Sequence, residues 1–168
     1  MPRTPGQGMG FLLGLWSVLA LLGPLHAPAR ASDAELLRLE SALHEAVNGF
    51  RREQHLIPLE RRVDLDAVAR GHSADMAARG FFAHETPEGL DWVDRLERAG
   101  VSGFALAGEN VGQTSRAHPN TEILEGWKHS PVHRENLTAR PYNATGLGIA
   151  RSPDGRLFYT QLYVTFPR

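Results

Sequence analysis

Three polar side chains lie beside predicted turns rather than in the middle of predicted helices or strands. His84 follows two phenylalanines in "FFAHETPEGLDW", Glu109 lies in "LAGENVG", and His133 lies in "WKHSPVHRENL". An imidazole titrates near neutral pH, so His84 is a candidate metal ligand or general base. Glu109 is a candidate to accept a proton from His84 or to bind a metal ion together with it.

Each of these residues also has a purely structural explanation. His84 would then be a partly buried histidine bonded to a backbone carbonyl, which is the commoner case for a single histidine. His72, on an apolar helical face, is expected to be a core or interface histidine rather than a ligand. Glu109 stands between Gly108, which allows close backbone approach, and Asn110, which offers donors and acceptors. Glu109 and Asn110 would then form a hydrogen-bond clamp, and single residues do not decide between the two explanations.

The stretch around His133 contains further polar side chains. His129 and His133 are four residues apart, but Pro131 between them argues against a helical HxxxH zinc site. Ser130 and His133 could act together in acyl transfer, but the stretch lacks the glycines of a nucleophile elbow, which argues against a serine hydrolase. Glu125 faces either the same site or the solvent.

The first 31 residues have the pattern of a secretory signal. Residues 1–10 carry one charge, Arg3, and residues 11–25 read "FLLGLWSVLALLGPL". This apolar run is short for a membrane span and contains a proline, and the small residues around Arg30 suit a cleavage site. We therefore expect cleavage after Ala31, a secreted protein in the periplasm or outside the cell, and no membrane span in the mature chain. An uncleaved anchor is the alternative.

The composition of residues 32–168 suits one domain with one core. Loss of the leader removes two arginines and no acid, so the net charge falls from −1 to −3. A mildly acidic chain without a basic stripe argues against a nucleic-acid partner. The chain has no cysteine, which excludes disulfides, a thiol nucleophile and cysteine-ligated zinc. No feature of the sequence predicts an oligomeric state.

Hydrophobic periodicity predicts helices first and a hairpin last. Helices are expected over 32–54, 64–80, 87–100 and 118–130, with a short helix over 132–137. "GFALAGENVGQT" suits a strand or an irregular crossing. Residues 144–166 contain two β-rich runs joined by "SPDG", which predicts a hairpin. This order indicates an α+β domain in which helices cover an antiparallel sheet.

Taken together, the motifs resemble those of the CAP superfamily of cysteine-rich secretory, antigen 5 and pathogenesis-related proteins. The similarity is greatest to the short bacterial SCP-like extracellular proteins. "HEAVNGFRREQ" and the following stretch to "GFFAH" resemble the family's opening helices and its aromatic-x-His step. "AGENVG", "EGWKHSPVHRENL" and "GLGIARSPDGRLFYTQLYV" resemble its Gly-Glu-Asn motif, its bacterial Trp-x-x-Ser-Pro-x-His motif and its closing hairpin. The resemblance covers nearly all of residues 32–168.

The resemblance implies an α-β-α sandwich and a cleft lined by a His/Glu cluster. His84 matches the family's first histidine and Glu109 its first glutamate. Ser130 and Phe158 stand where many members have a second glutamate and a second histidine, which puts a four-residue metal site in doubt. The implied cluster is then His84, Glu109 and His133, with Asn110, Ser130 and Glu125 as cleft support. Two imidazoles and a carboxylate could hold Zn²⁺ or another divalent cation with an open position.

Three functions follow from this resemblance. The first, which we favour, is a secreted binding module for a lipid, a small ligand or a protein partner. The second is a metal-assisted hydrolase or peptidase that acts on a peptide or another cell-envelope component. The third is a structural, envelope-associated protein in which the cluster only stabilises the fold. Fold alone does not decide between them.

Overall fold

The computed structural model describes residues 33–167, so the predicted leader over residues 1–31 lies outside the described part. Within residues 33–167, five helices and four strands follow one another along the chain. In chain order they are α1 Asp33–Glu53, β1 Glu60–Arg61, α2 Val63–Arg79, α3 Trp92–Arg98, β2 Leu106–Thr114, α4 Pro119–His129, α5 Pro131–Thr138, β3 Ala144–Arg151 and β4 Leu157–Thr165. Among these residues, no helix is long and apolar enough to cross a membrane.

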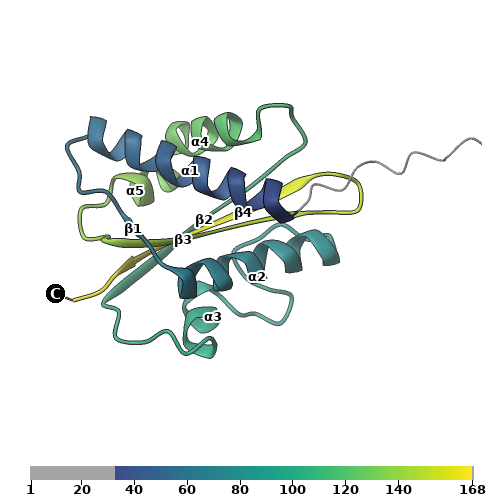
Figure 1. Ribbon diagram of the computed structural model, residues 1–168. Helices are drawn as coiled ribbons and strands as arrows, with labels where there is room; N and C mark the ends of the chain where they lie inside the picture. Colours follow the sequence, from purple (N-terminus) through teal and green to yellow (C-terminus); the bar gives the residue numbers. More distant parts are fainter. Residues whose placement is uncertain (1–32, 168) are drawn as a thin grey trace, which may run out of the picture.

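The elements form three layers. In Figure 1 the sheet lies between α1, α4 and α5 on one face and α2 and α3 on the other. We call these the α1 layer and the α2 layer. The strand order is β1-β3-β4-β2. The predicted α-β-α sandwich is confirmed, and the predicted hairpin is the β3–β4 pair.

Two predictions need correction. The sheet is mixed rather than antiparallel, because the two-residue strand β1 pairs in parallel with β3 at one edge. The predicted helix over 87–100 begins only at Trp92, because Asp91 forms a capping box with Asp94. The residues before it form a turn instead, in which the N–H of Thr86 donates to the carbonyl of Leu90 (3.0 Å).

The sheet buries an apolar cluster on each face. Against the α1 layer, Leu43, Trp127 and Tyr163 belong to one cluster of buried side chains. Against the α2 layer, Leu65 and Leu162 belong to another. The alternation of side chains along a strand therefore sends neighbouring residues of β2 and β4 into different layers.

Two glycines allow α2 to lie directly against β3. A Cβ atom at Gly146 would overlap the backbone of Leu65, and one at Gly148 would overlap the backbone between Ala69 and Arg70. Only a residue without a side chain fits at such a close approach. The Gly-x-Gly spacing in "ATGLGIA" thus fixes where α2 packs on the sheet.

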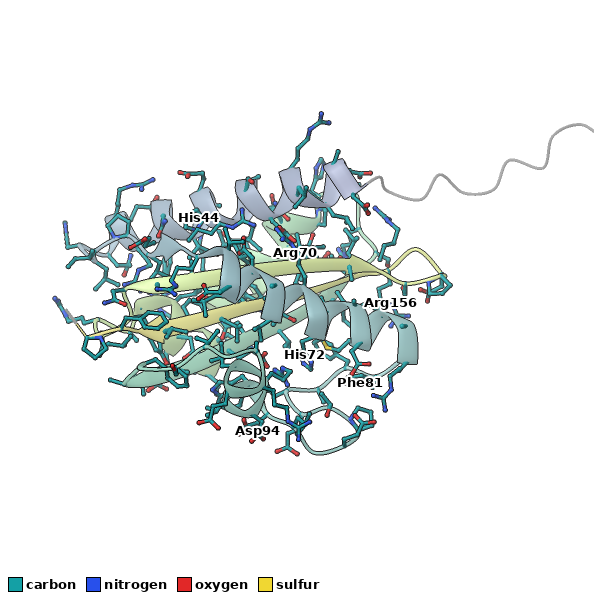
Figure 2. All side chains as sticks on the ribbon, turned by 60° about the horizontal axis from the view of Figure 1, so that its bottom comes forward. His44, Arg70, His72, Phe81, Asp94 and Arg156 are labelled. Atoms are coloured by element: carbon teal, nitrogen blue, oxygen red, sulfur yellow. The ribbon has the colours of Figure 1, made fainter. Side chains whose placement is uncertain are left out.

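Buried charge joins the two layers near β3. The Glu40 carboxylate of α1 is almost fully buried and accepts hydrogen bonds from Arg61 (2.7 Å) and Arg70 (2.5 Å). One of its oxygens also accepts from the backbone N–H of Ile149 (3.2 Å). Figure 2 shows Arg70 between α2 and α1. This carboxylate is compensated on all sides, which a buried charge requires.

Arg51 fastens the end of α1 to the segment between α5 and β3. Its side chain is fully buried, and its guanidinium donates to the carbonyls of Ile57 (3.0 Å), Leu137 (2.9 Å), Ala139 (3.2 Å) and Tyr142 (3.3 Å). Burial lowers the pKa of Arg51 from its usual value. The guanidinium fork offers five N–H donors in a fixed plane, so one side chain satisfies four carbonyls of two separate segments.

Candidate functional site

The free edge of β2 is covered by side-chain donors from both helical layers. Within residues 33–167, β2 pairs with β4 on one side only, which leaves alternate carbonyls on its other edge without strand partners. The donors are the indole N–H of Trp92 to Ala107 (3.3 Å), the Asn136 amide to Glu109 (3.1 Å) and the indole N–H of Trp127 to Val111 (2.9 Å). These contacts bring α3, α5 and α4 to the edge of the strand that carries Glu109.

The Glu109 carboxylate is buried and both of its oxygens are engaged. Its side chain is 0% exposed. Oε1 lies 2.9 Å from Nδ1 of His84, and Oε2 lies 2.5 Å from Nη2 of Arg95. A buried carboxylate needs such partners, because an uncompensated charge inside a protein is costly. The predicted contact between His84 and Glu109 is therefore present in the structure.

Arg95 is the residue of this site that sequence reasoning missed. Its side chain is only 9% exposed. Besides Glu109, it donates to the carbonyls of His84 (2.8 Å) and Leu90 (2.9 Å). The signal was Glu109 itself: a carboxylate in an apolar strand needs a cation, and Arg95 and Arg98 are the two basic residues of the preceding helix.

The contact with Glu109 defines which nitrogen of His84 carries the proton. An ionised carboxylate only accepts hydrogen bonds, so Nδ1 of His84 must be the donor. Nε2 of the neutral ring then keeps its lone pair. The ring packs edge-on against Trp92, with centroids 5.8 Å apart, and the side chain remains 40% exposed. His84 thus offers one acceptor nitrogen to an approaching group.

His133 reaches the same edge of β2 from the α1 layer. Its backbone carbonyl accepts from the Asn110 amide (3.0 Å), and the Asn136 amide donates in turn to Oδ1 of Asn110 (2.9 Å). Nδ1 of His133 lies 2.8 Å from Oγ of Ser130. Burial lowers the pKa of His133, and protonation of His84 would lower it further. The two histidines thus reach neighbouring residues of β2, Glu109 and Asn110, from opposite layers.

Two other residues named from the sequence lie in different surroundings. Glu125 is on the exposed side of α4, where its carboxylate accepts from Lys128 (2.8 Å) and lies 3.8 Å from Nδ1 of His129. Phe158 is buried in β4, and its ring centroid lies 6.4 Å from that of Phe82. The clamp role proposed for Asn110 agrees with its bonds to His133, Asn136 and Tyr163 (3.2 Å).

The arrangement of these side chains does not fit a metal ion held by His84, Glu109 and His133 together. Arg95 already neutralises Glu109, and Nδ1 of His84 occupies the second carboxylate oxygen. In the part of the chain that the structure describes, no three His, Asp or Glu side chains form a group that could hold a metal ion. A guanidinium thus stands beside Glu109 where a metal site would need a free carboxylate oxygen.

A hollow of about 660 Å³ lies beside the β3–β4 turn and is lined in part by Phe81 and Phe82, which precede His84 in the chain. We call it the Phe82 groove. Its lining includes Phe81, Phe82 and Phe158, and the Phe82 side chain is exposed. Arg79 and Arg156 also line the groove, and the Arg79 guanidinium lies 5.8 Å from the centre of the Phe81 ring. Arg79 is paired with Glu88 (2.6 Å), so this rim is polar but largely charge-compensated.

Comparison with known proteins identifies a family. A model of the cysteine-rich secretory protein family (CAP) matches residues 44–163. An uncharacterized membrane protein of Bacillus subtilis, YlbC, is 30% identical over 146 residues, which are 84% of this chain and 40% of YlbC. Another B. subtilis protein, YkwD, is 29% identical over 113 residues, 67% of this chain and 43% of YkwD. The chain thus spans less than half the length of either relative.

Solved structures show the same fold. An extracellular protein with an SCP domain from Bacillus anthracis superposes with a TM-score of 0.69 at 29% identity, covering 80% of this chain and 44% of that one. An outer surface protein of Borrelia burgdorferi superposes with a TM-score of 0.70 at 18% identity, covering 77% of this chain and 94% of that one. The second similarity concerns the fold alone.

Proposed function

Because the chain belongs to the cysteine-rich secretory protein (CAP) family, we propose that it is an exported binding module whose ligand contacts His84 and His133. The ligand meets these imidazoles at the free edge of β2, between the two helical layers. The chain acts in the cell envelope or outside the cell, as its apolar leader and its similarity to an extracellular B. anthracis protein both favour.

The observation that carries this proposal is the environment of Glu109. A catalytic carboxylate or metal ligand needs a free oxygen, and both oxygens of Glu109 are taken by Arg95 and His84 inside the protein. The carboxylate therefore orients the ring of His84 rather than reacting itself. What remains available is the half-exposed imidazole edge, which accepts a hydrogen bond when neutral and donates one when protonated.

The phenylalanines that precede His84 in the chain and line the Phe82 groove favour a ligand with a polar group and an apolar part. The polar group binds to the two imidazoles, and the apolar part lies in the Phe82 groove. Pockets for such ligands combine apolar walls with a few placed polar groups. A lipid or another amphipathic component of the cell envelope has this chemistry.

Hydrolysis is the second candidate, and one observation favours it. A carboxylate bonded to Nδ1 of a histidine leaves Nε2 as a base, as in proteins that activate a water or hydroxyl nucleophile. The Glu109–His84 pair has this arrangement. In this version no metal is needed, and His84 rather than Glu109 takes the proton.

Ligand titrations followed through the histidine ring signals test the binding proposal. The probes are lysophosphatidylglycerol below its micelle concentration and a muramyl peptide, each added to residues 32–168. We expect one probe to move the signals of His84 and His133 and to bind at least ~10-fold more weakly to His84→Ala. His129→Ala is the matched control, because His129 is 80% exposed and lies on the outer side of α4.

The outcomes separate the three functions. Shifts confined to His129 or spread over the surface would contradict the binding proposal. New products in mass spectra of the muramyl peptide, lost in His84→Ala, would replace it with hydrolysis. No shift with either probe, together with a lower melting temperature of His84→Ala, would assign the cluster to stability alone.

A further inference from the structure

His72 is a third histidine close to the site, and it is buried rather than exposed. It lies on the inner side of α2 with 1% of its surface exposed. Its ring meets that of Phe81 edge-on, with centroids 5.9 Å apart. In Figure 2 His72 and Phe81 lie together beneath α2, and Phe81 stands three residues before His84 in the chain. The histidine is thus placed against the backbone of that segment.

The ring of His72 makes one hydrogen bond, and its direction is fixed. Nε2 lies 2.9 Å from the carbonyl oxygen of Ala83. A carbonyl only accepts, so Nε2 carries the proton and Nδ1 has the lone pair. Nδ1 is buried and has no hydrogen-bond partner among the described residues. Protonation of the ring would leave a buried N–H without an acceptor there, which disfavours the charged form.

The backbone around His84 is therefore held on both sides. His72 donates to the carbonyl of Ala83, and Arg95 donates to the carbonyl of His84. These are consecutive carbonyls of one short, irregular segment. Irregular segments lack the regular hydrogen bonds that fix a helix or strand, so side-chain donors must take their place.

We propose that His72 is a positioning residue that fixes the backbone at Ala83 and so holds the His84 ring against Glu109. This inference deepens the proposed function, since it concerns the same imidazole, but it makes a claim about the free protein. Its test therefore needs no ligand, and it stands or fails separately from ligand binding.

The surroundings of His72 agree with a neutral ring. Burial lowers its pKa, and the charge of Arg95 acts in the same direction. Glu109, the hydrogen bond to Ala83 and Asp75 act in the opposite direction, but burial is the largest effect. A neutral imidazole offers one N–H, which is the donor that Ala83 requires.

Nitrogen-15 spectra that detect the ring nitrogens through their non-exchanging protons test this role. In the wild-type protein at neutral pH, His72 should be the Nε2–H tautomer and His84 the Nδ1–H tautomer. His72→Leu should give a mixture of His84 tautomers, because the segment before it loses its donor. His72→Gln places an amide N–H near the position of Nε2 and should restore the single Nδ1–H form of His84.

His44→Leu is the control for loss of stability alone, because His44 is a half-buried histidine of α1 that bonds Asn48 (3.2 Å). It should leave the His84 tautomer unchanged. A folded His72→Leu protein with an unchanged His84 would overturn the proposal, as would a failure of His72→Gln to restore it. If His72→Leu does not fold, the wild-type spectrum still decides, since an Nδ1–H form of His72 contradicts the bond to Ala83.

Discussion

The guanidinium of Arg95 lies 2.5 Å from the carboxylate of Glu109 inside the α2 layer, and His84 occupies the other oxygen of that carboxylate. The ion pair with Arg95 holds the Glu109 carboxylate in place, and the carboxylate in turn orients the imidazole of His84. The chemistry available to a ligand is then that of His84 and His133 at the edge of β2, with the carboxylate behind them.

Removal of the Arg95 charge should destabilise the fold strongly. Arg95→Met leaves the Glu109 carboxylate buried without its cation, which typically costs about 3–5 kcal/mol. Urea denaturation of residues 32–168 measures this. Arg98→Met is the matched control, because Arg98 is exposed one turn further along α3. A loss below about 1 kcal/mol in Arg95→Met would show that Glu109 does not depend on Arg95.

Neutralising the partner should recover part of that loss. Glu109→Gln removes the buried charge, so the double variant with Arg95→Met should be more stable than Arg95→Met alone. The comparison of the two single variants with the double variant isolates the coupling between the residues. Strictly additive losses would contradict a direct ion pair.

The close packing of α2 on β3 gives another prediction. Gly148→Ala forces a Cβ atom against the α2 backbone and should lower the free energy of unfolding by about 1–3 kcal/mol or more. Gly71→Ala, in α2 with open space around its Cα, should instead be neutral or stabilise by up to about 1 kcal/mol. Equal effects of the two substitutions in thermal denaturation would contradict the packing.

The elements were largely predictable, and the supporting contacts were not. Periodic apolar residues predicted α1 and α2, and "SPDG" predicted the β3–β4 hairpin, because local patterns carry this information. The sequence also argued against a four-residue metal site, because Ser130 and Phe158 stand where many members of the family have a glutamate and a histidine. Arg95 was missed because its contact with Glu109 joins two segments whose approach depends on the whole fold. The parallel pairing of β1 was missed because two residues carry no strand pattern.

The pH dependence of stability should be set by buried histidines between pH 7 and pH 5. Burial lowers the pKa of His72 below its usual value of about 6.5, so the unfolded chain binds a proton more readily. The stability from its neutral form is complete above that value and is lost as the pH falls below it. His72 contributes a slope of at most about 1.4 kcal/mol per pH unit.

Urea denaturation at pH 7, 6 and 5 measures this slope. His72→Gln does not titrate and should flatten it, while the charged groups that face this position, Glu109, Arg95 and Asp75, are unchanged in that variant. A wild-type protein equally stable at pH 7 and pH 5 would contradict the assignment.

Arg51 should not be replaceable by lysine. A lysine at this position would carry the same charge but offers a single ammonium in place of the planar fork that reaches four carbonyls. We expect Arg51→Lys to lose about 2 kcal/mol or more, because buried carbonyls of two segments lose their donors. Arg52→Lys, at an exposed neighbouring position, is the control. Similar melting temperatures of the two variants would show that the fork geometry is unimportant.

The most direct test of the site concerns its metal content. Residues 32–168 are incubated with zinc, dialysed and measured by mass spectrometry beside His84→Ala and His133→Ala. Because Arg95 and His84 occupy the Glu109 carboxylate, we predict that the wild-type protein retains no more zinc than either variant. About one zinc ion per wild-type chain, absent from both folded variants, would contradict the ion-paired site. It would support the metal site of His84, Glu109 and His133 that the sequence suggested.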